Sequence, residues 1–199
     1  MNLDLNDPAF QDYAMLLGES NVGLIPTLSL FGYALSDSEN PWSESISAII
    51  DSADIHNPVS RETGKHRMPP ERKELVKMMA EKNLDISREL YKHGAKFLAG
   101  SGTDINGTIP GVSLHREIQL LTKVGLNNRQ AIATASGNFS EIFGWKEIGT
   151  VKADSRADIL VLNSNPLEDI RNLSDIDTIY LAGRRINRED ILMRYSMPR

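Results

Sequence analysis

The sequence contains no cysteine, which excludes a disulfide framework, a cysteine-based zinc site and a thiol nucleophile. It has no apolar run of the length that spans a bilayer. Its net charge of −5 gives neither a basic footprint for nucleic acid nor a polybasic patch for a membrane surface. The acidic N-terminus lacks the basic segment and apolar core of a signal peptide. We therefore expect a cytoplasmic protein with no nucleic-acid or membrane partner. The absence of cysteine fits a reducing compartment, and it also fits a periplasmic protein.

The overall composition is that of an ordinary globular protein. Of the 199 residues, 40% are apolar and 25% are charged, which is enough to bury a core. Helical patterns dominate as far as Trp145, and short β-type runs follow it. A run of helices and strands followed by a run of strands predicts two packed units.

Capping signals locate the expected helices. Asp7 and Pro8 predict a helix that ends near Gly18. The longest helix is expected over residues 71–93, with an apolar stripe at helical spacing made by Leu75, Met79, Ile86 and Leu90. Shorter helices are expected at about 114–124, after an Asn127 cap, and at Asn138–Glu141, which has the form of a capping box.

Two apolar runs predict buried parallel strands, Val22–Leu30 and Ala95–Ala99, although Pro26 would remove a hydrogen-bond donor from the first. The long irregular segment 32–70 between them is typical of a lid or binding loop and contains a short helix pattern after Asn40. The later β-type runs are 149–152, 157–162 and 177–182, with a turn at Gly183 that returns a final strand.

An acidic residue follows the second apolar run at a position where α/β proteins place catalytic groups. Ala95–Ala99 leads through a glycine-rich turn to Asp104. The carboxyl ends of parallel strands are where such folds present their reactive side chains, so Asp104 is the first candidate for a catalytic residue. The alternative is a loop aspartate that bonds its own backbone, as turn acids often do.

From Ala95 to its end, the sequence resembles the C-terminal part of metal-dependent amidohydrolases, in the branch of imidazolonepropionase-like and prolidase-like enzymes. The motifs that carry the resemblance are Gly102-Thr-Asp104, Pro110-Gly-x-Ser-Leu-His115-x-Glu117, Gly125-Leu126, Ala157-Asp-Ile-Leu-Val-Leu-Asn163 and Asn165-Pro-Leu-x-Asp-Ile170. Each motif is weak alone, and their order along the chain makes the resemblance specific.

The resemblance implies an α/β fold made of the C-terminal part of a (β/α)8 TIM-type barrel and the C-terminal strands of a small β-sandwich. Val22–Leu30 would be the seventh barrel strand and Lys96–Gly100 the eighth. Residues 1–145 would then form the partial hydrolase barrel, with the long loop 32–70, and residues 146–199 the share of the sandwich.

The resemblance also implies hydrolysis of a non-peptide carbon–nitrogen bond, in an amide or cyclic amide, by water activated on a divalent metal, most simply zinc. Asp104 would bind the metal and shuttle the proton. His115 would touch the substrate, a small-molecule amide or dipeptide-like compound; alternatively it pairs locally with Glu117 or the loop.

The other metal ligands of that family are absent from these residues. The chain contains no His-x-His, and a catalytic zinc usually takes three protein ligands. His56 and His66 fall in the long loop, where surface histidines are common. The alternative hypothesis is therefore a chain that is catalytically incompetent alone. It would be a truncated product, a pseudoenzyme remnant, or one half of a split protein that needs an N-terminal complementing chain or a homo-oligomer.

Overall fold

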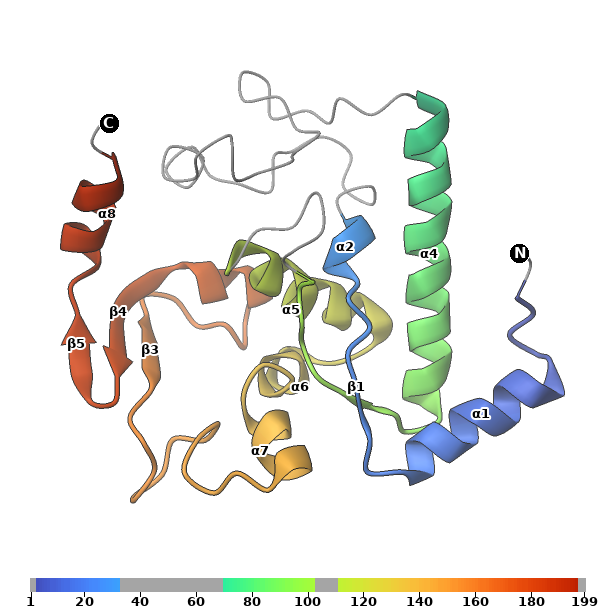
Figure 1. The fold of residues 1–199 in the computed structure, drawn as a ribbon, viewed down its shortest axis with the longest axis horizontal. Coiled ribbons are helices and arrows are strands. Elements are labelled where there is room, and N and C mark those ends of the chain that lie inside the picture. The colour runs from blue at the N-terminus through green and yellow to red at the C-terminus, as the bar shows by residue number, and fades with distance from the viewer. Residues whose placement is uncertain (1–2, 33–69, 103–110, 197–199) are drawn as a thin grey trace.

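The computed structural model describes residues 3–32, 70–102 and 111–196 (Figure 1). In chain order the elements are α1 (Pro8–Glu19), β1 (Gly23–Leu24), α2 (Ser29–Gly32), α4 (Pro70–Lys92), β2 (Lys96–Phe97), α5 (Val112–Val124), α6 (Asn128–Ala133), α7 (Gly137–Phe143), β3 (Ile159–Leu162), the 3-10 helix η2 (Ile170–Ser174), β4 (Ile176–Leu181), β5 (Arg184–Ile186) and α8 (Arg188–Ser196). None of the described helices combines the length and the apolar character needed to cross a membrane.

The first helix begins where its capping signal predicts. The Asp7 side chain accepts a hydrogen bond from the backbone N–H of Ala9 at 2.8 Å, and Pro8 takes the first helical position. α1 then runs one residue beyond Gly18, which lies against the end of α4. A Cβ atom on Gly18 would overlap the backbone carbonyl oxygen of His93. Glycine is therefore what lets the two helices approach.

A short parallel pair joins β1 to β2. Gly23 is opposite Lys96, Leu24 is opposite Phe97, and the N–H of Leu98 donates to the carbonyl of Leu24 at 2.9 Å. The parallel arrangement agrees with the expectation of two parallel strands, which α4 connects (Figure 1).

The first strand is much shorter than predicted, because the chain leaves the strand after Leu24. Pro26 offers no N–H for a ladder, and Thr27 has a φ of 51°, in the left-handed region. The chain turns there into α2, so the expectation of a strand reaching Leu30 is wrong.

The outer edge of β2 is covered by the start of α7 and the segment that precedes it. The N–H of Ala99 donates to the carbonyl of Thr134, and the Asn138 side-chain amide donates to the carbonyl of Phe97, each at 2.9 Å. The prediction that Asn138 caps a helix is therefore wrong, since α7 begins at Gly137 and Asn138 bonds a strand. The capping box in this region belongs to Asn127 and Gln130 at the start of α6.

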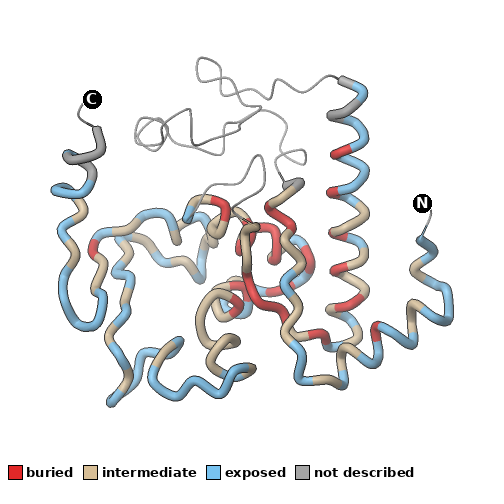
Figure 2. The backbone as a smooth tube through the Cα atoms, in the orientation of Figure 1, coloured by how far each residue is buried: buried red, intermediate tan, exposed pale blue. Residues whose placement is uncertain are grey.

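The core lies along β2 and the inner faces of α4 and α5 (Figure 2). Its largest fully buried apolar side chains are Phe97, Leu98, Leu120 and Leu121. The predicted stripe on α4 is correct only near its C-terminal end. Leu75 and Met79 are 55% and 44% exposed, and the buried face instead runs through Val76, Ala80, Leu84, Ser87 and Leu90. Both stripes have helical spacing, and contact with α1, α2 and α5 selects the second.

The C-terminal part forms a three-stranded antiparallel sheet in the order β3-β4-β5, on the opposite side of the parallel pair from α1 and α4 (Figure 1). Ala182 and Gly183 have positive φ angles of 48° and 77°, which suits a tight hairpin turn between β4 and β5. The predicted β-type run at 149–152 is not a strand. The Ser140 hydroxyl donates to the Ile148 carbonyl and holds the chain before this run against α7. The sequence pattern also missed α8.

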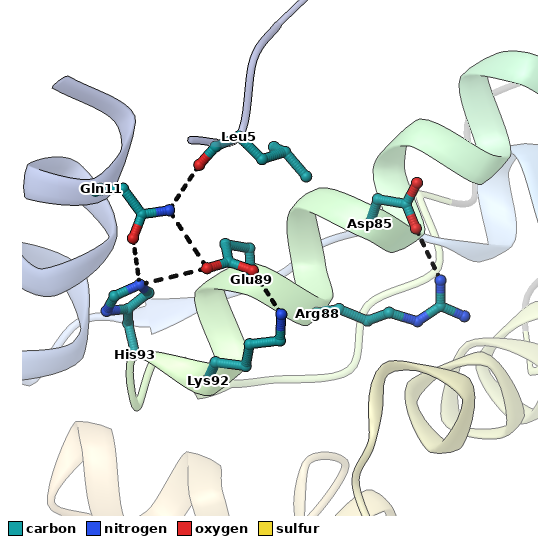
Figure 3. Close-up of polar contacts among 7 residues, drawn as sticks. All are labelled: Leu5, Gln11, Asp85, Arg88, Glu89, Lys92 and His93. Atoms are coloured by element: carbon teal, nitrogen blue, oxygen red, sulfur yellow. Dashed lines mark hydrogen bonds and ion pairs between the residues drawn. The ribbon is translucent and has the colours of Figure 1, made fainter. Parts of the chain in front are cut away.

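A polar network fastens α1 to the end of α4 (Figure 3). The Gln11 amide donates to the Leu5 carbonyl at 2.6 Å and to Glu89 Oε1 at 3.3 Å, while its oxygen lies 2.9 Å from His93 Nε2. Hydrogen bonds from Lys92, and then from Gln11, lower the pKa of Glu89 below its ordinary value. The network therefore joins the same two helices that meet at Gly18.

Gly18→Ala tests the close approach of the two helices. We expect the free energy of unfolding to fall by about 1–3 kcal/mol, the usual cost of overpacking, because the new methyl group forces the backbone of α1 away from His93. Urea denaturation measures the change. Gly137→Ala is the control, since its Cβ would meet nothing nearer than 3.6 Å, and it should cost nothing measurable. Equal effects of the two substitutions would contradict the steric account.

Candidate functional site

The residue with the most explicit predicted role, Asp104, belongs to the segment 103–110 and lies outside the described residues. His56, His66 and the helix expected after Asn40 also lie outside them. The structure does describe the backbone on both sides of Asp104, at Gly102 and at Gly111. Because β1 and β2 are parallel, the segment that carries Asp104 leaves the same end of the pair as the loop that follows β1.

A buried carboxylate lies at this end of the parallel pair. Glu117, on α5, has an exposed fraction of 0%, and its Oε2 atom accepts a hydrogen bond from the backbone N–H of Ser29 at 2.6 Å. The Ser29 hydroxyl in turn donates to the carbonyl of Ser101 at 3.4 Å. Glu117 therefore connects α5 to both chain segments that leave the two strands.

The environment of Glu117 favours its neutral form. Burial raises its pKa to about 7, although backbone N–H groups of Ser29, Leu28 and Thr27 act in the opposite direction. Its second oxygen, Oε1, has no hydrogen-bond partner among the described residues. A carboxyl group with this pKa changes its charge in the physiological range.

Sequence reasoning assigned Glu117 no role of its own, although its position carried a signal. It falls on the apolar face of α5, next to Ile118 and one turn from Leu114 and Leu121. An acid in the middle of a helical apolar stripe predicts a buried carboxylate that needs a partner. The partner could not be read from the sequence, because Ser29 is 88 residues away along the chain.

His115 lies at the start of α5, as predicted. Its Nδ1 atom is buried without a hydrogen-bond partner in the described part of the chain, and burial lowers its pKa below the ordinary value. The structure gives no hydrogen bond between His115 and Glu117 within residues 111–196. Residues two apart on a helix point in different directions, which explains why His115 does not pair with Glu117. The other part of that alternative, a contact with the loop 103–110, falls on residues outside the described ones.

The structure also contains a cavity of about 190 Å³ at the other end of β2. Its lining residues are Tyr91, Ala95, Lys96, Phe97, Leu126, Gln130, Ala133, Asn138, Glu141 and Ile142. Lys96 pairs with Glu141 at 2.7 Å. The cavity is thus separate from Glu117 and from the segment that leads to Asp104.

Within residues 3–32, 70–102 and 111–196, no three histidine, aspartate or glutamate side chains are grouped so that they could hold a metal ion. The described residues therefore do not fit a zinc site by themselves. Asp104 remains the one ligand proposed from the sequence.

No protein-family model matches the chain, and no curated protein matches its sequence. Solved structures do match. A Xaa-Pro dipeptidase with bound methionine in its active site is 18% identical, with a TM-score of 0.61, covering 91% of this chain and 37% of that one. A bottromycin amidohydrolase is 22% identical, with a TM-score of 0.62, covering 86% and 38%. A putative prolidase from Bifidobacterium longum is 21% identical, with a TM-score of 0.53, covering 87% and 39%.

Over most of its length, the chain therefore shares the fold of the C-terminal part of amidohydrolase and prolidase chains. It is a mixed α/β structure that spans less than two fifths of the length of the structures it matches. At these sequence identities the similarity establishes the fold.

The raised pKa of Glu117 predicts a pH-dependent stability. Between pH 4.5 and about 7 the folded state holds a proton that the unfolded state releases, so the contribution of Glu117 is full below pH 4.5 and is lost as the pH rises through about 7. The loss amounts to about 3 kcal/mol at most. The lowered pKa of His115 acts with the opposite sign, because stability falls as the pH drops below 6.5.

Comparing wild type with Glu117→Gln isolates the contribution of the carboxyl group, since His115 and all other groups are shared. From pH 5 to pH 7.5, urea denaturation should show the wild type losing stability relative to the variant, by up to about 3 kcal/mol. Parallel pH profiles for the two proteins would contradict the raised pKa.

Proposed function

We propose that this chain belongs to a metal-dependent amidohydrolase that hydrolyses a non-peptide carbon–nitrogen bond, in an amide or cyclic amide. The observation that carries the proposal is the parallel pair β1–β2, whose carboxyl ends release the segment containing Asp104, in a fold shared with amidohydrolase and prolidase structures. Reactive groups of such folds gather at the carboxyl ends of parallel strands.

The finer architecture is part of the proposal. β1 and β2 would be the last two strands of a (β/α)8 barrel formed by residues 1–145, and β3, β4 and β5 the C-terminal share of a small β-sandwich formed by residues 146–199. The direct parallel pairing of β1 and β2 across the long helix α4 supports the first part. The antiparallel order β3-β4-β5 supports the second.

Asp104 is proposed as metal ligand and proton shuttle. A bound divalent ion, most simply zinc, would lower the pKa of a water molecule to about 7 and polarise the substrate carbonyl. The Asp104 carboxylate would accept the proton of that water and deliver it to the leaving nitrogen. The remaining ligands must come from outside the described residues, which contain no group of three metal-binding side chains.

His115 is proposed to contact the substrate, because its Nδ1 atom is buried and has no hydrogen-bond partner among the described residues. The substrate class is a small-molecule amide or a dipeptide-like compound. The similarity to a Xaa-Pro dipeptidase and to a putative prolidase supports the dipeptide-like alternative.

A second proposal concerns the isolated chain, which we expect to be catalytically incompetent alone. A catalytic zinc usually needs three protein ligands, and this chain offers Asp104. The missing ligands would come from an N-terminal complementing chain or from another copy in a homo-oligomer. The exposed apolar side chains of Val22 and Ile25 beside β1, 56% and 46% exposed, support such a partner.

The metal role of Asp104 can be measured without turnover. Mn²⁺ added to the full chain should broaden the amide signals of Gly102 and Gly111, the described residues that flank Asp104, more than signals beside the surface acid Asp12. Asp104→Asn should abolish the difference because it removes the charged ligand, whereas the control Asp12→Asn should leave it. Equal broadening at both places in the wild type would count against a metal position at Asp104.

Turnover and zinc content separate the two proposals. We expect the purified chain to retain less than one equivalent of zinc after dialysis and not to hydrolyse alanyl-proline or methionyl-proline. If it instead holds stoichiometric zinc and turns over a dipeptide, the incompetence proposal is wrong. In that active protein Asp104→Ala should abolish turnover and leave the circular dichroism spectrum unchanged.

A further inference from the structure

The loop after β1 presents its backbone to the Glu117 carboxylate. The N–H of Ser29 donates to Oε2 at 2.6 Å, and the N–H groups of Leu28 and Thr27 also face the carboxyl group. Thr27 has a φ of 51°, and a left-handed residue in a turn directs successive N–H groups to one side. A fully buried acid on α5 thus lies in a backbone concavity that offers it hydrogen-bond donors.

A second contact continues from this loop to the other strand. The Ser29 hydroxyl donates to the carbonyl of Ser101 at 3.4 Å, three residues before Asp104. The two segments are also in direct contact, because a Cβ atom on Gly100 would lie 2.6 Å from Ile25 Cγ2. Glu117, Ser29 and Ser101 therefore form a chain of contacts from α5 to the backbone that leads to Asp104.

Packing alone does not explain an acid at this position. A buried carboxyl group loses its hydration, and an apolar side chain of similar size would fill the space without that cost. Methionine has nearly the same length and shape as glutamate, yet it offers no oxygen to the N–H of Ser29. Glutamate differs from methionine here because its carboxyl oxygen accepts a hydrogen bond from the Ser29 N–H, in the loop after β1.

We propose that Glu117 is a positioning residue, which through Ser29 fixes the backbone of Ser101 and Gly102 from which Asp104 departs. This inference rests on the proposed function, because the positioned segment carries the proposed metal ligand. The chain of contacts from Glu117 through Ser29 to Ser101, which we call the link, does not depend on catalysis.

A matched pair of variants tests the link in the full chain by amide hydrogen exchange and backbone amide spectra. Glu117→Met should raise the exchange rate of the Ser29 amide at least about tenfold, the effect of losing a hydrogen bond to a carboxylate. It should also shift the signals of Ser101 and Gly102. Glu117→Gln retains an acceptor oxygen and should keep the Ser29 exchange rate within about threefold of the wild type.

The amides of Leu120 and Leu121 report on the core of α5 in the same experiment. A purely structural role for Glu117 would raise the exchange rates of these amides and of Ser29 together in Glu117→Met. The proposal expects the exchange rate of Ser29 to rise while those of Leu120 and Leu121 stay unchanged. Uniform acceleration, or an unchanged Ser29 in Glu117→Met, would overturn it.

Ser29→Ala removes the hydroxyl that contacts Ser101 and also bonds to Glu117, and it leaves the buried acid in place. It therefore remains informative if Glu117→Met does not fold. It should shift the signals of Ser101 and Gly102 while the Ser29 amide, now of alanine, keeps its protection. Unchanged signals at Ser101 would overturn the link. The Mn²⁺ measurement tests a different claim. If Mn²⁺ does not preferentially broaden the Gly102 signal, the metal role of Asp104 is contradicted and the link is unaffected.

Discussion

The parallel pairing of β1 with β2 is the constraint on which the rest of the described structure depends. It involves only Gly23 with Lys96 and Leu24 with Phe97, yet it brings together chain segments that α4 and a long connection separate. Because the strands run in the same direction, both following loops emerge at one end. The Ser29 hydroxyl contacts the carbonyl of Ser101 and so joins the two loops, while the Ser29 N–H bonds to the buried Glu117 on α5.

The two ends of this pair have different chemistry. At the amino end of β2, a cavity of about 190 Å³ is lined mainly by apolar side chains, and Lys96 there is already paired with Glu141. At the carboxyl end are a carboxyl group with a pKa of about 7 and an imidazole nitrogen without a partner among the described residues. Groups whose charge can change are more useful for hydrolysis than satisfied ion pairs, so the carboxyl end carries the functional proposal.

Local signals predicted some of the helix starts and did not predict the tertiary contacts. The caps at Asp7 and Asn127 lie where expected, because each depends on neighbouring residues alone. The predicted core-facing stripe of α4 at Leu75 was wrong, because packing partners choose between two stripes of equal spacing. Asn138 also shows that neighbouring residues do not determine tertiary contacts. The residues around it favour a helix cap, but its side chain bonds to the carbonyl of Phe97, which is distant in sequence. The predicted site residue Asp104 stays a prediction.

The cover on the outer edge of β2 has a consequence for self-association. Thr134 and Asn138 already satisfy Ala99 and Phe97 there, whereas no strand pairs with the outer edge of β1 within the described ranges. Copies of a protein can associate edge to edge without limit only if each copy has two unpaired sheet edges. A further strand could add to this pair at the outer edge of β1. A strand beside β2 would first have to displace Asn138 from the carbonyl of Phe97 and Thr134 from the N–H of Ala99.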